Sequence, residues 1–343
     1  MTPSRERQEN VNRPRIHILH ENDDWLPPFH AALEAAGLPY VNWSLAGGSI
    51  DLAAEPPEGV FWSRLSASAH TRGHVYAKEY ARALFRWLEA AGRRVVNGSN
   101  VVEFEVSKAA QYAALAAAGF DVPHTIFVVG SDGLKSRARE LPAPFITKHN
   151  QGGKGLGVRR FDSYEEFDTY VEGPDFEEPT DGITLLQEYV QSAAPFITRA
   201  EFVGGQFVYA VRVDTSGGSF ELCPAEACAV PEQASRQGLA PATCDLPASP
   251  TGAASAPLFM KRNDITASHP LIVRLRDFLA AEGIEVAGVE FFETVDGRLI
   301  PYDINTNTNY NPDVESATSN AGATSVAEFL GRELASRYTA VSA

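Results

Sequence analysis

The chain has 343 residues, of which 44% are hydrophobic and 21% are charged, and its formal net charge is −15. This length and composition suit a globular protein of two or three compact units. The acidic charge argues against a nucleic acid or an anionic membrane surface as a partner, because both are themselves negatively charged.

The location of the protein is indicated by its N-terminus and its cysteines. The first 13 residues, MTPSRERQENVNR, contain no apolar segment of the signal-peptide type, and no apolar run in the chain approaches the roughly 20 residues that span a bilayer. Three cysteines, Cys223, Cys228 and Cys244, are too few for a disulfide scaffold, and their spacing matches no common zinc knuckle. We therefore expect a cytoplasmic protein with reduced cysteines.

The first part of the chain alternates strands with helices. After an expected disordered leader, residues 1–14, we predict strands at 15–20, 40–45, 59–65 and 93–99 and helices at 27–37 and 75–92. Strands that alternate with helices favour a parallel sheet covered on both faces. We expect one such α/β unit, wound in the Rossmann manner, over residues 15–104.

The remainder of the chain mixes helices with hairpins. Helices are expected at 106–119, 163–173 and 269–283, and hairpins at 197–215 and 286–305. Between them, residues 214–262 are rich in alanine, proline, serine and glycine and show weak periodicity. Such a long segment is either a lid over a site or a disordered insertion.

The expected hairpin at 286–305 contains the stretch EFFETVDGRLIPYDIN, residues 290–305, which suggests a metal site. It is expected to turn through two residues at Asp296–Gly297. Alternation along its second strand places Asp303 and Asn305 on one face, and Glu290 on the first strand faces them if the register allows. Two carboxylates and an amide offer the oxygen ligands that Mg²⁺ prefers, usually beside a bound polyphosphate.

A glycine-rich segment, FITKHNQGGKGLGV, is the candidate phosphate grip. A strand delivers Lys148, and the loop that follows contains Gly152, Gly153, Lys154, Gly155 and Gly157. Glycines allow a close approach of backbone N–H groups to phosphate, and lysine supplies charge. The GK[ST] ending of a P-loop is absent and a strand follows, so a glycine-rich flap over a nucleotide fits better than a Walker A motif. A flexible surface hairpin is the alternative.

Taken in order, these residues resemble the ATP-grasp superfamily, and most of all its carboxylate–amine ligases of the glutathione synthetase and ribosomal-protein glutamate-ligase type. The resemblance covers about residues 105–335 and adds Lys108 and the segment from Gln187 to Val190 to the pattern. It implies a Rossmann-like pre-ATP-grasp domain followed by a two-lobed ATP-grasp domain of mixed α+β type. The small lobe is then expected at 105–185 and the C-terminal lobe at 186–343.

The resemblance also implies roles for individual residues. Lys108 and Lys148 are expected to hold the phosphates of ATP, and Glu290, Asp303 and Asn305 two Mg²⁺ ions, with Mn²⁺ as an alternative. The adenine and ribose are expected to contact the hinge strand, namely Gln187, Glu188, Tyr189 and Val190. Relatives of this type are commonly dimers or tetramers, which makes a homo-oligomer an expectation.

The sequence departs from the family pattern at three places. Asp303 stands where the second acid is usually glutamate, and the following NTNTNYNP segment keeps Asn307 but lacks the usual Pro-Gly. An Arg-x-Asn expected after Arg212 is missing, and Lys261 or Arg262 are candidates to supply the charge. We therefore expect the substrate end of the site to differ from that of relatives.

Two further groups of residues are candidates for catalysis and substrate binding. Arg199 and Arg212, on the two arms of one hairpin, are expected to hold the γ-phosphate and the acyl phosphate, unless they are solvated or ion-paired strand residues. The loop that ends the third strand is expected to clamp an anionic substrate, although a plain surface loop is an alternative and zinc is disfavoured. Its candidate residues are Arg64, His70, Arg72 and His74.

These observations predict an ATP-dependent ligase that joins a carboxylate to an amine through an acyl phosphate, with an amino acid or small peptide as substrate. No nucleophile motif of the G-x-S-x-G type is present. Three alternatives remain, namely a small-molecule kinase on the same scaffold, a non-catalytic nucleotide-binding regulator, and a zinc hydrolase that uses the histidines and cysteines.

Overall fold

Three separate β-sheets organise the chain in the computed structural model. The structure describes residues 13–153, 155, 157–216, 257–318 and 321–338. The expected leader lies outside these residues, except for its last two positions, and so do most of the expected lid and all three cysteines. None of the described helices is long and apolar enough to cross a membrane.

The first sheet has four parallel strands in the order β2-β1-β3-β4. Its strands are β1 (Arg15–His20), β2 (Tyr40–Ser44), β3 (Gly59–Arg64) and β4 (Arg94–Val96). Its helical elements are η1 (Asp23–Trp25), α2 (Pro27–Ala35), η2 (Ala69–Arg72) and α3 (Ala77–Ala90). Apolar side chains recur with helical spacing in α3, which buries Ala81, Leu84 and Leu88 against the sheet. The expected Rossmann-like arrangement is confirmed.

The second sheet is antiparallel and has the strand order β5-β8-β6-β7. Two short helices, α6 (Leu134–Ala138) and α7 (Tyr164–Glu172), cover one of its faces. The strands are β5 (Thr125–Val129), β6 (Phe145–His149), β7 (Arg159–Phe161) and β8 (Ile183–Glu188). Just before α7, the side chain of Ser163 accepts a hydrogen bond from the backbone N–H of Glu166, which is the bond expected of a serine at a helix N-cap.

The third sheet is antiparallel, with the order β11-β10-β9-β12-β13. It comprises β9 (Phe196–Val203), β10 (Gln206–Asp214), β11 (Phe259–Lys261), β12 (Val286–Glu293) and β13 (Leu299–Asn305). Helix α8 (Pro270–Ala281) packs on the face that carries Ala200, Phe202 and Val289. The hairpin between β12 and β13 turns through three residues rather than two, with Gly297 at φ +81°.

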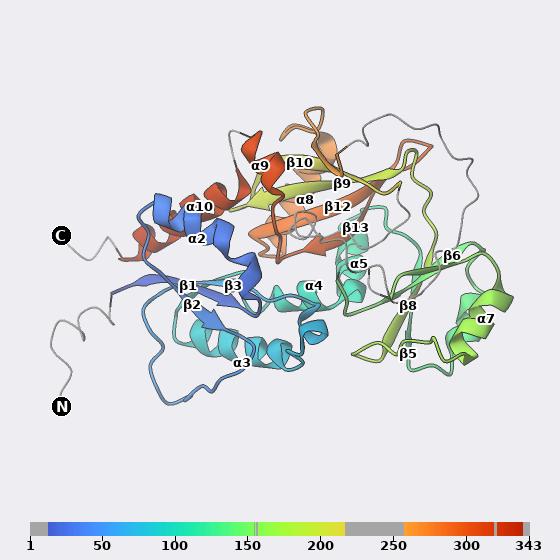
Figure 1. Ribbon diagram of the computed structural model, residues 1–343, viewed down its shortest axis with the longest axis horizontal. Helices are drawn as coiled ribbons and strands as arrows, with labels where there is room; N and C mark the ends of the chain where they lie inside the picture. Colours follow the sequence, from blue (N-terminus) through green and yellow to red (C-terminus); the bar gives the residue numbers. More distant parts are fainter. Residues whose placement is uncertain (1–12, 154, 156, 217–256, 319–320, 339–343) are drawn as a thin grey trace.

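Helices connect the three sheets. The chain passes from the first sheet through α4 (Val102–Val106) and α5 (Lys108–Ala117), and α5 contacts β13 of the third sheet. After α9 (Pro312–Ser316), helix α10 (Gly322–Tyr338) returns to the first sheet and packs against α2, β1 and β3. Figure 1 shows α10 and α2 on one face of the first sheet and α3 on the other. The first and third sheets therefore share a hydrophobic core.

A histidine buried in the first sheet should make stability depend on pH. His17 is 5% exposed and stacks on Phe61 with ring centroids 4.3 Å apart. Burial lowers the pKa of His17 to about 4, so the folded protein resists its protonation. The stabilisation from neutral His17 is complete above about pH 6.5 and is lost as the pH falls towards 4.

We expect the wild type to lose about 3 kcal/mol more of its free energy of unfolding than a His17→Phe variant between pH 7 and pH 4. Urea unfolding of both proteins at several pH values measures this difference. Equal pH dependence of the two proteins would contradict the assignment.

Candidate active site

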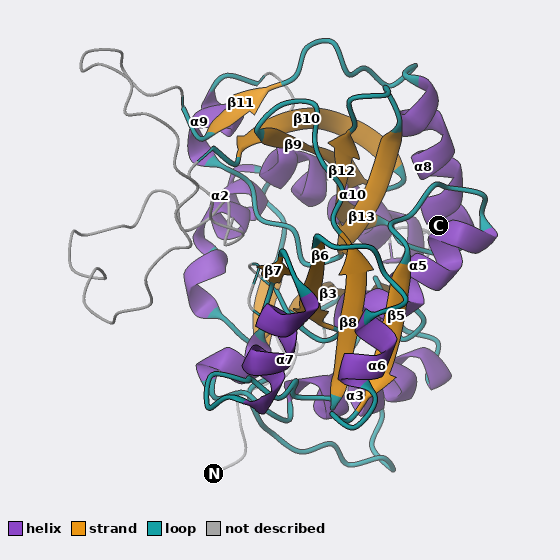
Figure 2. Cartoon of the chain, turned by 90° about the vertical axis from the view of Figure 1, so that its right-hand side faces the viewer, coloured by secondary structure: helices purple, strands orange, loops and turns teal. Residues whose placement is uncertain are grey.

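A large cleft lies between the second and third sheets. Its volume is about 680 Å³, within the range of small-molecule sites. Figure 2 shows the second sheet below the third, with β8 running towards β12 and β13. The residues that line the cleft include most of the expected nucleotide-binding residues and all three expected metal ligands. They are Lys108, Lys148, Gly152, Gly153, Gly155, Gln187, Glu188, Tyr189, Val190, Glu290, Asp303 and Asn305.

The two expected phosphate lysines reach this cleft from different elements. Lys148, on β6, is 6% exposed and donates a hydrogen bond to the hydroxyl of Tyr112 at 2.8 Å. Burial lowers the pKa of Lys148, and the carboxylates of Asp303 and Glu290 oppose that shift. Lys108 begins α5 and forms an ion pair with Asp303. Both ammonium groups are therefore directed at the end of β13.

The glycine-rich loop that follows Lys148 is held against the first sheet. Gln151 accepts a hydrogen bond from Lys78 of α3 at 2.7 Å, and Gly153 packs on Ser68. Gly157 has φ +72°, and a β-carbon there would lie 2.6 Å from the ring of His149. Lys154 is outside the described residues. The loop closes one end of the cleft, as a flap over a nucleotide would.

The expected adenine hinge comprises the last two residues of β8 and the two residues after them. Gln187 is buried, and its amide donates to Thr125 at 2.7 Å. The carboxylate of Glu188 accepts the backbone N–H of His124 at 2.9 Å, and the ring of Tyr189 lies under the guanidinium of Arg160. All three side chains thus have protein partners in the described structure.

The three expected metal ligands meet on one face of the third sheet. Glu290 pairs directly with Asp303 across β12 and β13, and the amide of Asn305 lies 3.4 Å from the Glu290 carboxylate. A β-bulge leaves Tyr302 without a partner residue and turns its hydroxyl towards Glu290, to which it donates at 2.6 Å. Burial would raise the pKa of Asp303, but Lys108 and Lys148 outweigh it and hold the pKa below its usual value.

This donor set suits Mg²⁺. Two carboxylates and one amide oxygen converge beside two lysines, and such hard oxygen ligands leave positions for phosphate and water. In the described structure, the same carboxylates pair with protein cations, Asp303 with Lys108 and Glu290 with Arg199. Within the described ranges no three histidine, cysteine, aspartate or glutamate side chains gather as a metal site. The expected triad contains only two carboxylates and does not require such a group.

The two expected catalytic arginines lie on opposite faces of the third sheet. Arg199 is 5% exposed and pairs across the sheet with Val211, whereas Arg212 pairs with Thr198. Because neighbouring residues of a strand alternate between faces, only Arg199 faces the cleft. Arg212 lies over the ring of Phe196 and 3.5 Å from Asp214. The two arginines therefore do not face the same site, although both were expected to hold phosphate groups.

A network of hydrogen bonds holds the Arg199 guanidinium. It donates to Glu201 at 2.7 Å, to Glu290 at 2.9 Å and to Thr308 at 2.7 Å. Gly288 leaves the required space, because a β-carbon there would lie 2.6 Å from the guanidinium. Burial disfavours the charged form, but the two carboxylates outweigh it and keep the pKa of Arg199 above its usual value.

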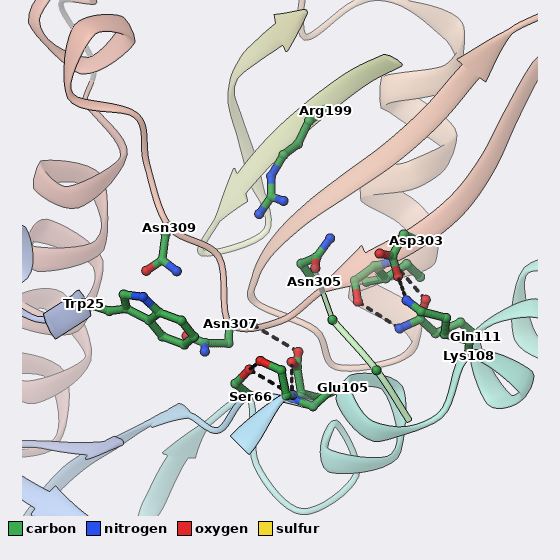
Figure 3. A pocket seen from close by; sticks show the side chains of 15 residues that line it. Trp25, Ser66, Glu105, Lys108, Gln111, Arg199, Asp303, Asn305, Asn307 and Asn309 are labelled. Atoms are coloured by element: carbon green, nitrogen blue, oxygen red, sulfur yellow. Dashed lines mark hydrogen bonds and ion pairs between the residues drawn. The ribbon is translucent and has the colours of Figure 1, made fainter. Parts of the chain in front are cut away.

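A second, small cavity of about 60 Å³ adjoins the cleft on the side of the first sheet. Figure 3 shows Arg199 entering it from β9 and Glu105 from the opposite side. Asn305, Asn307 and Asn309 line it, while the intervening Thr306 and Thr308 are buried. The two cavities share the wall formed by Lys108, Gly152, Gly153, Arg199, Asp303 and Asn305. A group bound in one cavity therefore lies next to a group bound in the other.

The loop after β3 faces the small cavity through Ser66, Ala67 and Ser68 rather than through its cationic residues. Arg64 is 2% exposed and donates to the Thr308 carbonyl and to Asn309, both at 2.6 Å. The expected cationic clamp is therefore not formed towards this cavity, and Arg64 instead positions the segment after β13.

The other three members of the expected clamp also bind protein groups. Arg72 and His74 both contact the buried carboxylate of Glu21, at 2.6 and 3.1 Å. His70 contacts the Ala67 carbonyl at 3.1 Å, and burial lowers its pKa. The charge of Arg72 is matched by Glu21, so this loop does not present an unpaired guanidinium to an anion.

Several cavity residues were not expected from the sequence. Glu105, Gln111 and Tyr302 have no motif of their own, and their positions depend on contacts with residues far along the chain. Glu105 accepts hydrogen bonds from residues about 200 positions later, and Gln111 donates to the Ile304 carbonyl at 2.9 Å. For these three residues, the only sequence signal of a role in the site was that Glu105 lies just before Lys108 in the chain.

Comparisons with known proteins agree with this geometry, although no protein-family model matches the chain. A "Probable alpha-L-glutamate ligase" of Xylella fastidiosa (strain M12) is 29% identical over 150 residues, 43% of this chain and 48% of that protein. The match thus spans about half the length of this relative. The protein of the same name from Xanthomonas campestris pv. campestris (strain 8004) is 26% identical over 234 residues, 63% of this chain and 72% of that protein.

Solved structures resemble the whole described fold. A RimK domain protein ATP-grasp from Sphaerobacter thermophilus DSM 20745 has a TM-score of 0.63 at 15% identity, covering 92% of this chain and 98% of that one. The ATP-grasp ligase PsnB complexed with minimal precursor gives 0.59 at 14%, covering 94% and 99%. D-cycloserine synthetase DcsG gives 0.58 at 17%, covering 93% and 99%. The chain therefore has the ATP-grasp fold and is similar in sequence to proteins named as probable alpha-L-glutamate ligases.

Proposed function

We propose that the protein is an ATP-dependent carboxylate–amine ligase that forms an amide bond through an acyl phosphate, on an amino acid or small peptide. The observation that carries this proposal is the pair of adjoining cavities. One has the size and the lysines for ATP, and the other is small and polar. Their shared wall of Lys108, Arg199, Asp303 and Asn305 is where a phosphoryl group would pass from nucleotide to substrate.

The reaction requires two displacements. A carboxylate oxygen attacks the γ-phosphorus of ATP and ADP leaves. An amine nitrogen then attacks the carbonyl carbon, phosphate leaves and the nitrogen loses a proton. Lys108 and Lys148 neutralise the transferring phosphoryl group, and Arg199 adds a positive charge at the shared wall. Glu290, Asp303 and Asn305 would hold Mg²⁺, with two ions proposed, and the metal would offset charge on the phosphates.

A substrate screen tests the proposal. Purified protein is incubated with ATP, Mg²⁺ and pairs drawn from amino acids and dipeptides, beginning with L-glutamate because of the relatives' name, and the products are analysed by mass spectrometry. We expect ADP and phosphate only when a carboxylate and an amine are both present. A phosphorylated product formed without an amine would indicate a kinase instead. If no pair led to ADP release, both the ligase and the kinase assignments would be contradicted.

The role of Lys148 can be tested separately. We expect Lys148→Met to raise the KM for ATP about 10- to 100-fold, because the cleft loses a buried positive charge next to the phosphates. Steady-state ADP release at varied ATP concentration measures this change. Lys135→Met is a matched control, since Lys135 lies in the same lobe but pairs with Glu172 on the surface. An unchanged KM in Lys148→Met would mean that the glycine-rich segment does not grip the phosphates.

A further inference from the structure

Glu105 places a carboxyl group in the small cavity without a cation beside it, and burial, with the nearby charge of Asp303, raises its pKa. One carboxylate oxygen accepts the backbone N–H of Ala67 at 2.9 Å, and the other accepts three donors from Thr306 and Asn307 at 2.8 to 3.2 Å. All four donors are neutral. Among the described residues, no lysine, arginine or histidine nitrogen pairs with this carboxylate, in contrast to Asp303 and Glu290. The first oxygen retains an acceptor position, because a carboxylate offers about four in total.

Asn307 supplies a second acceptor without a donor. Its side-chain oxygen is buried and has no hydrogen-bond partner in the described structure, and the residue lines the same cavity as Glu105. A buried, unpaired amide oxygen costs free energy unless a ligand or water satisfies it. Figure 3 shows both side chains on the same wall, across the cavity from Arg199. The wall therefore offers two acceptors, one of them a carboxyl group whose ionised form a bound cation would favour.

The size and charge of the cavity restrict what can bind there. A volume of about 60 Å³ holds a group of a few heavy atoms. The two cations of the lining, Lys108 and Arg199, lie on the wall shared with the cleft, whereas Glu105 has no cation beside it, so a carboxylate fits the shared wall and is repelled next to Glu105. An ammonium group would satisfy Glu105 electrostatically and donate to the Asn307 oxygen. Its nitrogen would then lie next to the wall shared with the cleft, where the acyl group is formed. It would pass one proton to the Glu105 carboxylate before it attacks and lose a second proton when the amide forms.

Building on the proposed ligase function, we propose that the small cavity binds the amino group of the amine substrate as an ammonium ion, with Glu105 as its charge partner and Asn307 as its second acceptor. The amine substrate is accordingly a primary amine that is protonated in solution, such as the α-amino group of an amino acid or peptide. Glu105 also holds the segments around Ala67 and Thr306, so the test must separate the two roles.

Two nucleophiles of different charge distinguish ammonium binding by Glu105 from its structural role. L-glutamate carries an ammonium group at neutral pH, whereas hydroxylamine is largely uncharged and traps acyl phosphates as hydroxamates. With ATP and the same carboxylate panel, we measure the rate with each nucleophile and take their ratio. We expect Glu105→Gln to lower the ratio of the L-glutamate rate to the hydroxylamine rate at least tenfold, and Asn307→Leu at least threefold. A loss of fold alone would reduce both rates and leave the ratio unchanged.

Glu89→Gln is the matched control. Glu89 also accepts hydrogen bonds from neutral donors, the backbone N–H and hydroxyl of Ser99, but it lines a different surface pocket. We expect the ratio in this variant to equal that of the wild type. An unchanged ratio in Glu105→Gln would overturn the inference and leave Glu105 as a structural tie. If the wild type formed neither hydroxamate nor amide with any carboxylate, the ligase proposal itself would fail.

A second variant decides the question if Glu105→Gln melts below the assay temperature. Asn307→Asp keeps the shape of the side chain and its backbone N–H bond to Glu105, and it adds a negative charge at the unpaired oxygen. Binding of an ammonium ion predicts that the ratio rises or stays within twofold of the wild type while that of Asn307→Leu falls. A fall in the ratio for Asn307→Asp as large as that for Asn307→Leu would overturn the inference.

Discussion

Replacement of Asp303 by alanine should abolish ATP-dependent ADP release while the protein stays folded. Asp303 is at once an expected Mg²⁺ ligand and the ion-pair partner of Lys108. Its removal leaves Lys108 without a counter-ion and the metal without one of its two carboxylates. We expect turnover to fall by about 1,000-fold or more, equivalent to about 4 kcal/mol of transition-state stabilisation. Coupled ADP-release assays measure turnover, and circular dichroism with thermal melting reports on folding.

The control for this experiment lies in the same hairpin. Asp296 is exposed at its turn and pairs with Arg298, so Asp296→Ala removes a carboxylate without touching the cleft. This variant should retain wild-type turnover. Asn305→Ala should behave like Asp303→Ala. Normal activity in both Asp303→Ala and Asn305→Ala would refute the assignment of this hairpin as the metal site.

Replacement of Arg199 by methionine should destabilise the protein by about 3–5 kcal/mol and also abolish activity. The substitution preserves much of the side-chain volume but leaves the carboxylates of Glu201 and Glu290 without their shared cation. Breaking a buried ion pair by removal of one partner is costly, because the other charge remains buried and unpaired. Urea unfolding measures the loss of stability.

Arg212→Met and a double variant provide the comparisons for Arg199. Arg212 is about one-third exposed and pairs loosely with Asp214, so its replacement should cost less than about 1 kcal/mol. In Arg199→Met/Glu201→Gln, one orphaned carboxylate becomes neutral, and we expect recovery of part of the lost stability. Equal destabilisation by Arg199→Met and Arg212→Met would contradict the network inferred for Arg199.

The difference between these two arginines shows what sequence alternation can and cannot predict. Alternation correctly places Asp303 and Asn305 on one face of β13. The same reasoning applied to a regular hairpin turning at Gly204–Gly205 would pair Arg212 with Ile197 and put it on the face of Arg199. A bulge near Val208 shifts the register by one residue, so Arg212 pairs with Thr198 instead. One extra residue moves every later side chain to the other face, and no composition signal marks it.

The fold was predictable because its signals are local. Helix spacing in α3, the cap at Ser163 and the glycine turn of the β9–β10 hairpin each depend on a few neighbouring residues. The substrate end of the site was not predictable in the same way. Glu105 and Arg64 gain their roles from contacts with residues 306–309, which follow them by 200 positions or more. The roles of the individual site residues remain predictions until variants are measured.

The second sheet has a hydrophobic core of its own. All buried residues of that core lie between positions 126 and 186. None of them belongs to the hydrophobic cores of the first and third sheets. Polar contacts cross to the rest of the chain, among them Lys78–Gln151 and Lys148–Tyr112. Rupture of such contacts exposes little apolar surface, so opening this lobe costs far less than unfolding it. The paired amides of β6 and β8 should stay protected in such an opening, whereas the amides of Lys108 and Ala109, which donate to Asn150, should exchange with solvent at rates that respond to ATP but hardly to denaturant.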